Sequence, residues 1–170
     1  MLDTIVLTLD QRHFDVLLPE RFTPSAKGLL APPYYSLGLR GNFACVQNPS
    51  KSKLKAGHYE PRLTLSKRKA SNGFALGLRV EFSAPKMLLG NNFDELESSD
   101  FHDTMEVLHQ RLGEMGIRTS MDALRSAPVS AIHYSKNIPF TDYTSCSMVL
   151  NELARIDITK RLDLSHTTIP

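Results

Sequence analysis

The chain has 170 residues and a net charge of +2, with 41% hydrophobic and 22% charged residues. These values are ordinary for one globular domain that buries a substantial core. No apolar run approaches the roughly 18 residues that a membrane helix needs, and the N-terminus carries an acid instead of the basic flank of a signal peptide. Cys45 and Cys146 form neither a zinc-like pair nor a disulfide framework, so we expect a protein of the reducing cytoplasm.

The charge is unevenly distributed along the chain. Between residues 48 and 73, seven basic residues accompany one acid, which gives this stretch +6 and the rest of the chain −4. A later stretch holds six acids and no Lys or Arg. Such polarity favours an oriented approach to a polyanion such as nucleic acid, and the alternative is a solvated basic loop. The basic residues are Lys51, Lys53, Lys55, Arg62, Lys67, Arg68 and Lys69, and the acids are Asp94, Glu95, Glu97, Asp100, Asp103 and Glu106.

The first elements in chain order are strands. Residues 4–9 (TIVLTL) alternate and are rich in β-formers, and residues 13–18 (HFDVLL) are expected to pair back on them. Residues 23–41 contain enough proline and glycine to predict an irregular segment. A short strand is predicted at residues 42–47 (NFACVQ).

A hairpin is the strongest local signal. Two alternating runs between residues 61 and 85 flank Asn72-Gly73, the pair that a two-residue type I′ turn demands. The basic cluster would then lie along the first strand of this hairpin and near its turn.

A helix is predicted over residues 98–116. Ser98 or Ser99 is the expected N-cap, Gly116 is the expected stop, and Phe101, Met105, Leu108, Leu112 and Met115 form one apolar stripe. His102, Glu106 and His109 resemble metal-ligand spacing only superficially, so they predict a solvated helix face. A short helix at 121–125, a strand at 129–137 (VSAIHYSKN) and a helix at 145–155 follow.

This order favours an α+β fold in which residues 1–170 form a single domain. An antiparallel sheet of about five strands with helices packed on one face buries these patterns economically. The other face would be open to solvent, and we expect the chemistry there.

Side chains that alternate along the predicted strands suggest which groups meet on that open face. Glu81 shares a face with Arg79, and His133 shares a face with Ser135. If their strands are neighbours, Glu81 and His133 meet, and Asp3 joins them. Carboxylate and imidazole ligands suit Mg²⁺ or Mn²⁺, which would polarise a phosphodiester. The alternative is a wet sheet on which Glu81 pairs with Arg79 and His133 is structural.

Three segments resemble a known family. They are MLDTIVLTL at the start, VEFSAPKMLLGNNFDELESSDF at residues 80–101, and APVSAIHYSKN at residues 127–137. In this order and spacing they resemble the N-terminal half of phage and plasmid replication initiators, the family of the filamentous-phage gene II protein. The resemblance covers most of the chain from residue 1 to about residue 163.

The resemblance implies a rolling-circle initiator, which nicks one strand at a replication origin, stays linked to it through a tyrosine and rejoins the ends. It also implies the RRM-like sheet of the HUH endonucleases, with a divalent ion on two strand histidines and another polar ligand. His133 matches the first histidine, whereas Ser135 stands in place of the second. Glu81 lies where relatives supply an acid, and Asp3 matches an acid near the family's N-terminus.

The resemblance further implies a domain of a longer protein, because the family's nucleophilic tyrosine lies beyond this length. The fragment alone is then expected to be inactive. Its partners would be origin DNA, single-stranded or hairpin, and host replication proteins in the bacterial cytoplasm, with no membrane. The seven basic residues of the stretch 48–73 would bind phosphates.

The rival hypothesis is a non-catalytic DNA-binding regulatory module, supported by Ser135 and the missing tyrosine. A virion or scaffold protein has only the acidic helix in its favour.

Overall fold

The computed structural model describes residues 2–30, 43–70, 73–135 and 143–155. The chain divides into two compact units, Met1–Lys136 and Asn137–Pro170. In its described part, the second unit consists of α6 (Cys146–Arg155), none of whose residues is buried, and the few residues before it. None of the helices in the described ranges is long and apolar enough to cross a membrane.

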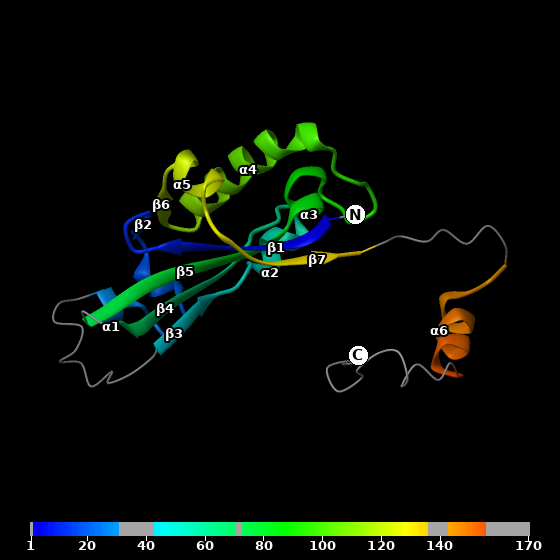
Figure 1. Cartoon of the computed structure of the whole chain (residues 1–170), viewed down its shortest axis with the longest axis horizontal. Coiled ribbons are helices and arrows are strands. Elements are labelled where there is room, and N and C mark those ends of the chain that lie inside the picture. The colour runs from blue at the N-terminus through cyan, green and yellow to red at the C-terminus, as the bar shows by residue number, and fades with distance from the viewer. Residues whose placement is uncertain (1, 31–42, 71–72, 136–142, 156–170) are drawn as a thin grey trace. The chain divides into compact units, whose positions relative to one another are not determined.

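Five antiparallel strands form the main sheet, in the order β3-β4-β5-β1-β7 (Figure 1). The α+β class and the five-stranded antiparallel sheet predicted from the sequence are confirmed. The strands are β1 (Leu2–Asp10), β3 (Phe43–Gln47), β4 (Arg62–Ala70), β5 (Gly73–Ser83) and β7 (Val129–Tyr134). The predicted hairpin is formed by β4 and β5, which pair as far as Ala70 and Gly73. Gly73 pairs with Ala70 and belongs to β5, so the prediction that Asn72-Gly73 form the two turn residues is wrong by one position. Ser71 and Asn72 lie outside the described residues.

Alternation along the strands separates a core face from an open face. Leu78, Val80 and Phe82 on β5 are each 0% exposed. Leu9, Leu7 and Ile5 of β1 are their respective partners across the β1–β5 ladder, so the same face is apolar on both strands. Burial of each such side chain stabilises the fold by about 1.5–3 kcal/mol. This face therefore contains the core, and the alternate residues face away from it.

Helices cover the core face of the sheet (Figure 1). They are α3 (Ala84–Leu89), α4 (Phe101–Glu114) and α5 (Met121–Arg125), with the segment that holds η1 (Pro19–Arg21) and α1 (Lys27–Leu30) also in the core. The helix α2 (Lys51–Lys55) is short and buries none of its side chains. The predicted helices at residues 98–116 and 121–125 are confirmed as α4 and α5.

The two ends of α4 are fixed differently. Gly116 has φ +84° just past the helix, so the prediction that it stops the helix is confirmed. The predicted serine cap is wrong. A capping box between Glu97 and Asp100 starts the preceding turn η2 (Ser98–Asp100), because each carboxylate accepts the other residue's backbone N–H. Phe101, the first residue of the predicted stripe, is 56% exposed, whereas Met105, Leu108 and Leu112 are buried.

A second, two-stranded sheet corrects another prediction. Residues 14–16 form β2 (Phe14–Val16), which pairs with β6 (Ile117–Thr119) and not with β1. The loop after α4 brings β6 alongside, and Leu17 N–H donates to Gly116 O at 2.8 Å. This pairing buries Phe14 and Ile117 in the core. A partner more than a hundred residues away leaves no local pattern, so turn residues at 10–12 suggested the nearer strand.

Candidate functional site on the open sheet face

Hydroxyl and guanidinium groups dominate the open face of the sheet. β4 contributes every second residue, and each of these lies opposite an open-face residue of β5. Across the β1–β7 ladder Thr4 lies opposite His133 and Val6 lies opposite Ala131, so this edge is polar at the first pair and apolar at the second, where Val6 is 1% exposed. The open-face residues of the central strands are Arg62, Thr64, Ser66, Arg68, Arg79, Glu81, Thr4, Val6 and Thr8.

A shallow groove of about 650 Å³ crosses this face between β4 and β7. Its walls include Arg68, Arg79 and Ser66, and its floor is low because Ala75 and Gly77 have small or no side chains. A Cβ added at Gly77 would lie 3.7 Å from Ser66 Oγ, so the glycine is not enforced by crowding. A larger side chain there would extend into the groove.

The charge of the groove is mainly positive. Arg68 and Arg79 are exposed, and Thr8 and Ser130 hydrogen-bond to each other through their hydroxyls on the far side. Asp10 lies at one end, where Arg12 donates to both of its carboxylate oxygens. The hydrogen bond from the Arg12 side chain is the main reason that the pKa of Asp10 falls to about 2. Asp10 is therefore charged but compensated. Both groove arginines are exposed, and Arg79 is paired with Glu81 at 3.3 Å.

The predicted metal ligands share a region of the sheet but do not form one site. Glu81 lies opposite Val6 and His133 lies opposite Thr4, so β1 separates them. Adjacent strands are about 4.8 Å apart, which puts the two backbones roughly 10 Å apart across β1. The Glu81 carboxylate lies 3.3 Å from the Arg79 guanidinium, which is the pairing that the wet-sheet alternative predicts.

The other two predicted ligands lie at the end of the sheet. Asp3 accepts a hydrogen bond from Ser83 Oγ at 3.3 Å and another from Thr4 Oγ1 at 3.4 Å. Ser135 follows the last residue of β7 and so is not part of the strand. Among the described residues, Asp3, Glu81 and His133 do not form a group whose ligand atoms lie within 4.8 Å of one another, so this structure does not bring the predicted Mg²⁺ or Mn²⁺ ligands together.

Tyr59 belongs to the same end of the sheet and was missed by the sequence analysis. Its hydroxyl accepts the Ser83 N–H at 2.8 Å. Burial raises the pKa of Tyr59, and the negative charges of Asp3 and Glu81 raise it further. No local pattern marks this residue, because its neighbours come from β1 and β5.

One group of three potential ligands does converge among the described residues. His102, Asp103 and Glu106 on α4 have ligand atoms within 4.8 Å of one another, and all three are exposed. His102 Nε2 lies 3.0 Å from Glu106, and Arg125 contacts the other ring nitrogen at 2.6 Å. His109 instead contacts Thr119 O at 3.0 Å. The three residues therefore lie on an exposed helix face, where His102 contacts both Glu106 and Arg125.

The predicted phosphate-binding residues divide between two faces of β4. Arg62 and Arg68 are exposed on the open face. Lys67 is 1% exposed on the core face, where its Nζ lies 4.1 Å from the centroid of the Phe74 ring. Alternation along the strand is the reason, because odd-numbered residues of β4 face the core. The side chain of Lys69 lies outside the described residues.

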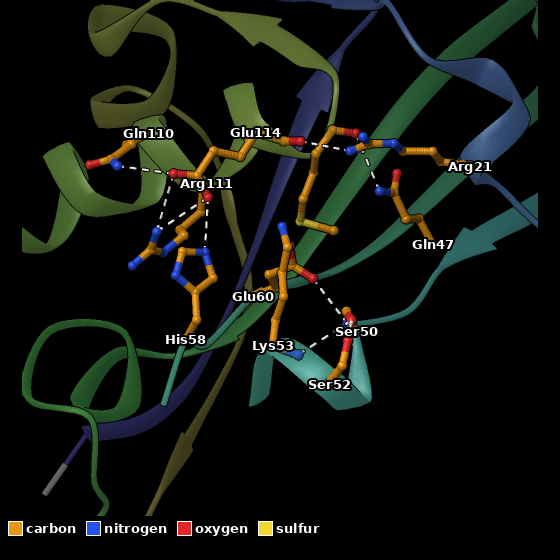
Figure 2. Close-up of polar contacts among 11 residues, drawn as sticks. Arg21, Gln47, Ser50, Ser52, Lys53, His58, Glu60, Gln110, Arg111 and Glu114 are labelled. Atoms are coloured by element: carbon orange, nitrogen blue, oxygen red, sulfur yellow. Dashed lines mark hydrogen bonds and ion pairs between the residues drawn. The ribbon is translucent and has the colours of Figure 1, made fainter. Parts of the chain in front are cut away.

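The three remaining lysines lie on α2 and not on the hairpin. Lys51 and Lys55 are exposed, whereas Lys53 Nζ lies 2.6 Å from Glu60. Glu60 also accepts the Ser50 N–H at 2.9 Å, so the helix start and Lys53 converge on one buried carboxylate (Figure 2). Of the three, Lys51 and Lys55 are therefore the more available to an anion.

A second carboxylate, Glu114, joins the chain between α2 and β4 to the end of α4 (Figure 2). His58 Nε2 lies 2.9 Å from one oxygen, and Arg111 and Gln110 donate to the carboxylate from the same helix. Burial acts to raise the pKa of Glu114, but hydrogen bonds from Gln110, His58 and Arg111 lower it overall. These contacts explain how a short helix with no buried side chain keeps its place.

Comparison with known proteins gives no relative: no family model, no curated protein and no solved structure matches the chain.

Proposed function

We propose that this chain is a DNA-binding domain of a phage or plasmid rolling-circle replication initiator, acting in the host bacterial cytoplasm. The open face of its sheet would bind the DNA backbone. Two lines of support are independent of each other: the three sequence segments that resemble the initiator family, and the groove between Arg68 and Arg79 on an otherwise hydroxyl-rich face.

The groove chemistry suits phosphates more than bases. Guanidinium groups bind phosphate oxygens through paired hydrogen bonds, and hydroxyls add further donors. The central strands β4, β5 and β1 place no aromatic side chain on their described open face, so base stacking contributes little there. Binding through the backbone supplies affinity with little sequence preference.

Strand nicking and joining is the activity that the family resemblance suggests for the whole initiator. It would need an ion site and a tyrosine nucleophile, whereas Glu81 pairs with Arg79 and is separated from His133 by β1. The binding role is therefore the function proposed for this chain by itself. This also agrees with the alternative of a non-catalytic regulatory module, which would use the same face.

Fluorescence anisotropy of labelled DNA at several salt concentrations tests the proposal. We expect affinity to fall steeply with salt, and Arg79→Gln to lower the slope by about one, as expected for loss of one phosphate contact. Arg118→Gln is the matched control, because Arg118 is exposed on the separate β2–β6 sheet and pairs with Asp15 at 2.9 Å. A salt slope near zero for the wild type would overturn the proposal.

Glu81→Gln separates the binding role from a metal-dependent one. If Glu81 only neutralises Arg79, its replacement frees the guanidinium, and DNA affinity rises a few-fold with no requirement for Mn²⁺. If Glu81 holds an ion that bridges to DNA, the same variant loses Mn²⁺-dependent binding instead. The DNA affinity of the wild type, measured with and without EDTA, shows how much of its binding depends on a divalent ion.

A further inference from the structure

An apolar groove on the helix side of the sheet is unrelated to the DNA-binding face. It encloses about 390 Å³ between β1, the start of α3 and the start of α4. Its apolar walls are Ile5, Leu96, Phe101 and Met105, and its rim includes the carboxylates Glu97 and Asp100. This volume is within the range of about 300–1,000 Å³ that is typical of ligand-binding clefts.

The groove continues into apolar surface that no described element covers. Ile132 on β7 lies directly opposite Ile5 on the same face of the sheet and is 42% exposed. Phe101 is 56% exposed at the first turn of α4, although its position in the sequence predicted burial. Neighbouring large apolar side chains that stay exposed beside a surface groove commonly mark a docking site for another protein.

The surroundings of the groove are strongly acidic. Between Met87 and Gln110 the chain has six acids and no Lys or Arg. Asp94, Glu95, Glu97, Asp103 and Glu106 are exposed. One cation approaches from another element, since Arg125 on α5 contacts His102 at 2.6 Å. A single guanidinium leaves most of the negative charge in place.

We propose that this groove docks a cationic amphipathic helix of a partner protein. Apolar side chains of such a helix would enter the groove beside Phe101, and its Lys and Arg residues would face the acidic rim. The charge argues against an anionic membrane or a nucleic acid as the occupant, because the rim would repel both. The groove opens above the core face of β1, not at a strand edge, so an added strand fits less well than a helix.

This inference goes beyond the proposed function and does not rest on it. Ile5 faces the helix side of β1, whereas Val6 and Thr8 face the opposite side, where the DNA would lie. A partner bound at the groove would therefore leave the arginines of the open face accessible.

Synthetic peptides provide the test with the full chain. The probe is a labelled Leu/Lys peptide of about 16 residues, which is long enough to form a helix on binding, with its leucines on one face. A scrambled isomer without an apolar face and a Leu/Glu analogue are the matched peptides. At about 0.15 M salt, where weak surface attraction is screened, we expect the amphipathic cationic peptide to bind at least tenfold more tightly than either.

Substitutions at two positions then locate the site. Phe101→Ala should weaken binding about tenfold, as for a buried aromatic anchor, whereas Leu17→Ala, with a side chain that is 53% exposed outside the groove, should not. Ser98 is exposed on the rim, and its side chain takes no part in the capping box. Ser98→Lys should therefore weaken binding and Ser98→Glu should strengthen it, with Gln11→Lys as the charge control elsewhere on the surface.

Three outcomes would overturn the proposal. Equal binding of the amphipathic and scrambled peptides would mean attraction by charge alone. Unchanged binding by Phe101→Ala and Ser98→Lys would place the peptide elsewhere. A concentration-dependent dimer in sedimentation that Phe101→Ala abolishes would assign the groove to a second copy of this chain. DNA affinity measured on the same variants should be unchanged, so failure here is distinguishable from failure of the proposed function.

Discussion

Two neighbouring residues, Lys67 and Arg68, show how a single step along a strand changes the role of a cation. Lys67 is 1% exposed and lies over the Phe74 ring, where its aliphatic stem packs with the core. Arg68 is exposed beside the groove on the other face. From composition both are members of one basic cluster. The geometry indicates a stabilising role for Lys67 and leaves Arg68 available for the proposed binding of DNA phosphates.

Lys67→Ala should therefore act on stability and not on DNA binding. Loss of the buried stem and of the contact with Phe74 is expected to reduce the free energy of unfolding by about 1–3 kcal/mol. Arg68→Ala should change that free energy by less than about 0.5 kcal/mol, as for a surface position, while it lowers the salt slope of DNA binding by about one. Urea denaturation and anisotropy on both variants check the pair. A lowered salt slope for folded Lys67→Ala would contradict this assignment.

At the scale of elements, sequence patterns were sufficient where the partners are local. The alternation on both sides of Gly73 predicted the β4–β5 hairpin, and the apolar stripe with Gly116 predicted α4. Sequence patterns were insufficient for β2, because its partner β6 follows α4, about a hundred residues later in the chain. The exposure of Phe101 has a similar cause: its position on the stripe is correct, but no described element extends over it.

Two glycines with positive φ offer a matched test of how the end of α4 is built. Gly116 has φ +84°, and an added Cβ would lie 2.7 Å from the side chain of Leu18. Gly57 has φ +78° with nothing within 4 Å. Gly57→Ala should lower the free energy of unfolding by about 1–2 kcal/mol, which is the strain of an alanine in the left-handed region. Gly116→Ala should cost at least about 1 kcal/mol more, because the clash adds to the strain. If urea denaturation gave equal losses of unfolding free energy for the two variants, the Leu18 side chain would have to move away from the added Cβ at little cost.

The attachment of α2 through Glu60 predicts a dependence on pH. Burial acts to raise the pKa of Glu60, but the hydrogen bonds from Lys53 and Ser50 outweigh it, and the pKa is lowered overall. A carboxyl whose folded pKa lies below its unfolded value of about 4.3 stabilises the fold at higher pH. That contribution is lost as the pH falls through the folded pKa.

Glu60→Gln should therefore reduce the free energy of unfolding by about 1–3 kcal/mol at neutral pH, the range for a hydrogen-bonded charge. The difference from the wild type should shrink as the pH falls below about 4, where protonation removes the same charge from the wild type. Urea titrations across this range measure it, with Glu20→Gln at an exposed position as the control. A difference that stays constant with pH would mean lost packing and not lost charge.

For the molecule as a whole, the sequence predicted two opposite charges but not where they lie. The basic stretch divides between the open face, the core face and α2, because a strand alternates and the lysines at 51–55 form a helix. The acidic stretch stays together, since most of it lies in the loop before α4 and on the exposed side of that helix. Two of the candidate metal residues are separated for a related reason: Glu81 and His133 share one face of the sheet, but strand order places β1 between them.

The division into two units leads to the last prediction, which concerns residues 1–136. Every buried hydrophobic residue in the described part of the chain lies between Val6 and Leu124. The helix α6 buries none of its residues, and its leucines at 150 and 153 are 64% and 55% exposed. An isolated helix of this length is marginal in water.

A chain ending at Lys136 should therefore unfold cooperatively, with a free energy of unfolding within about 1 kcal/mol of that of the full chain. The dependence of this free energy on urea should be unchanged, since it scales with the surface exposed on unfolding. The salt slope of DNA binding should also be unchanged, because the groove arginines belong to the first unit. Loss of cooperative unfolding in the shortened chain would show that residues 137–170 complete the core, whereas loss of DNA binding alone would place part of the DNA interface in them.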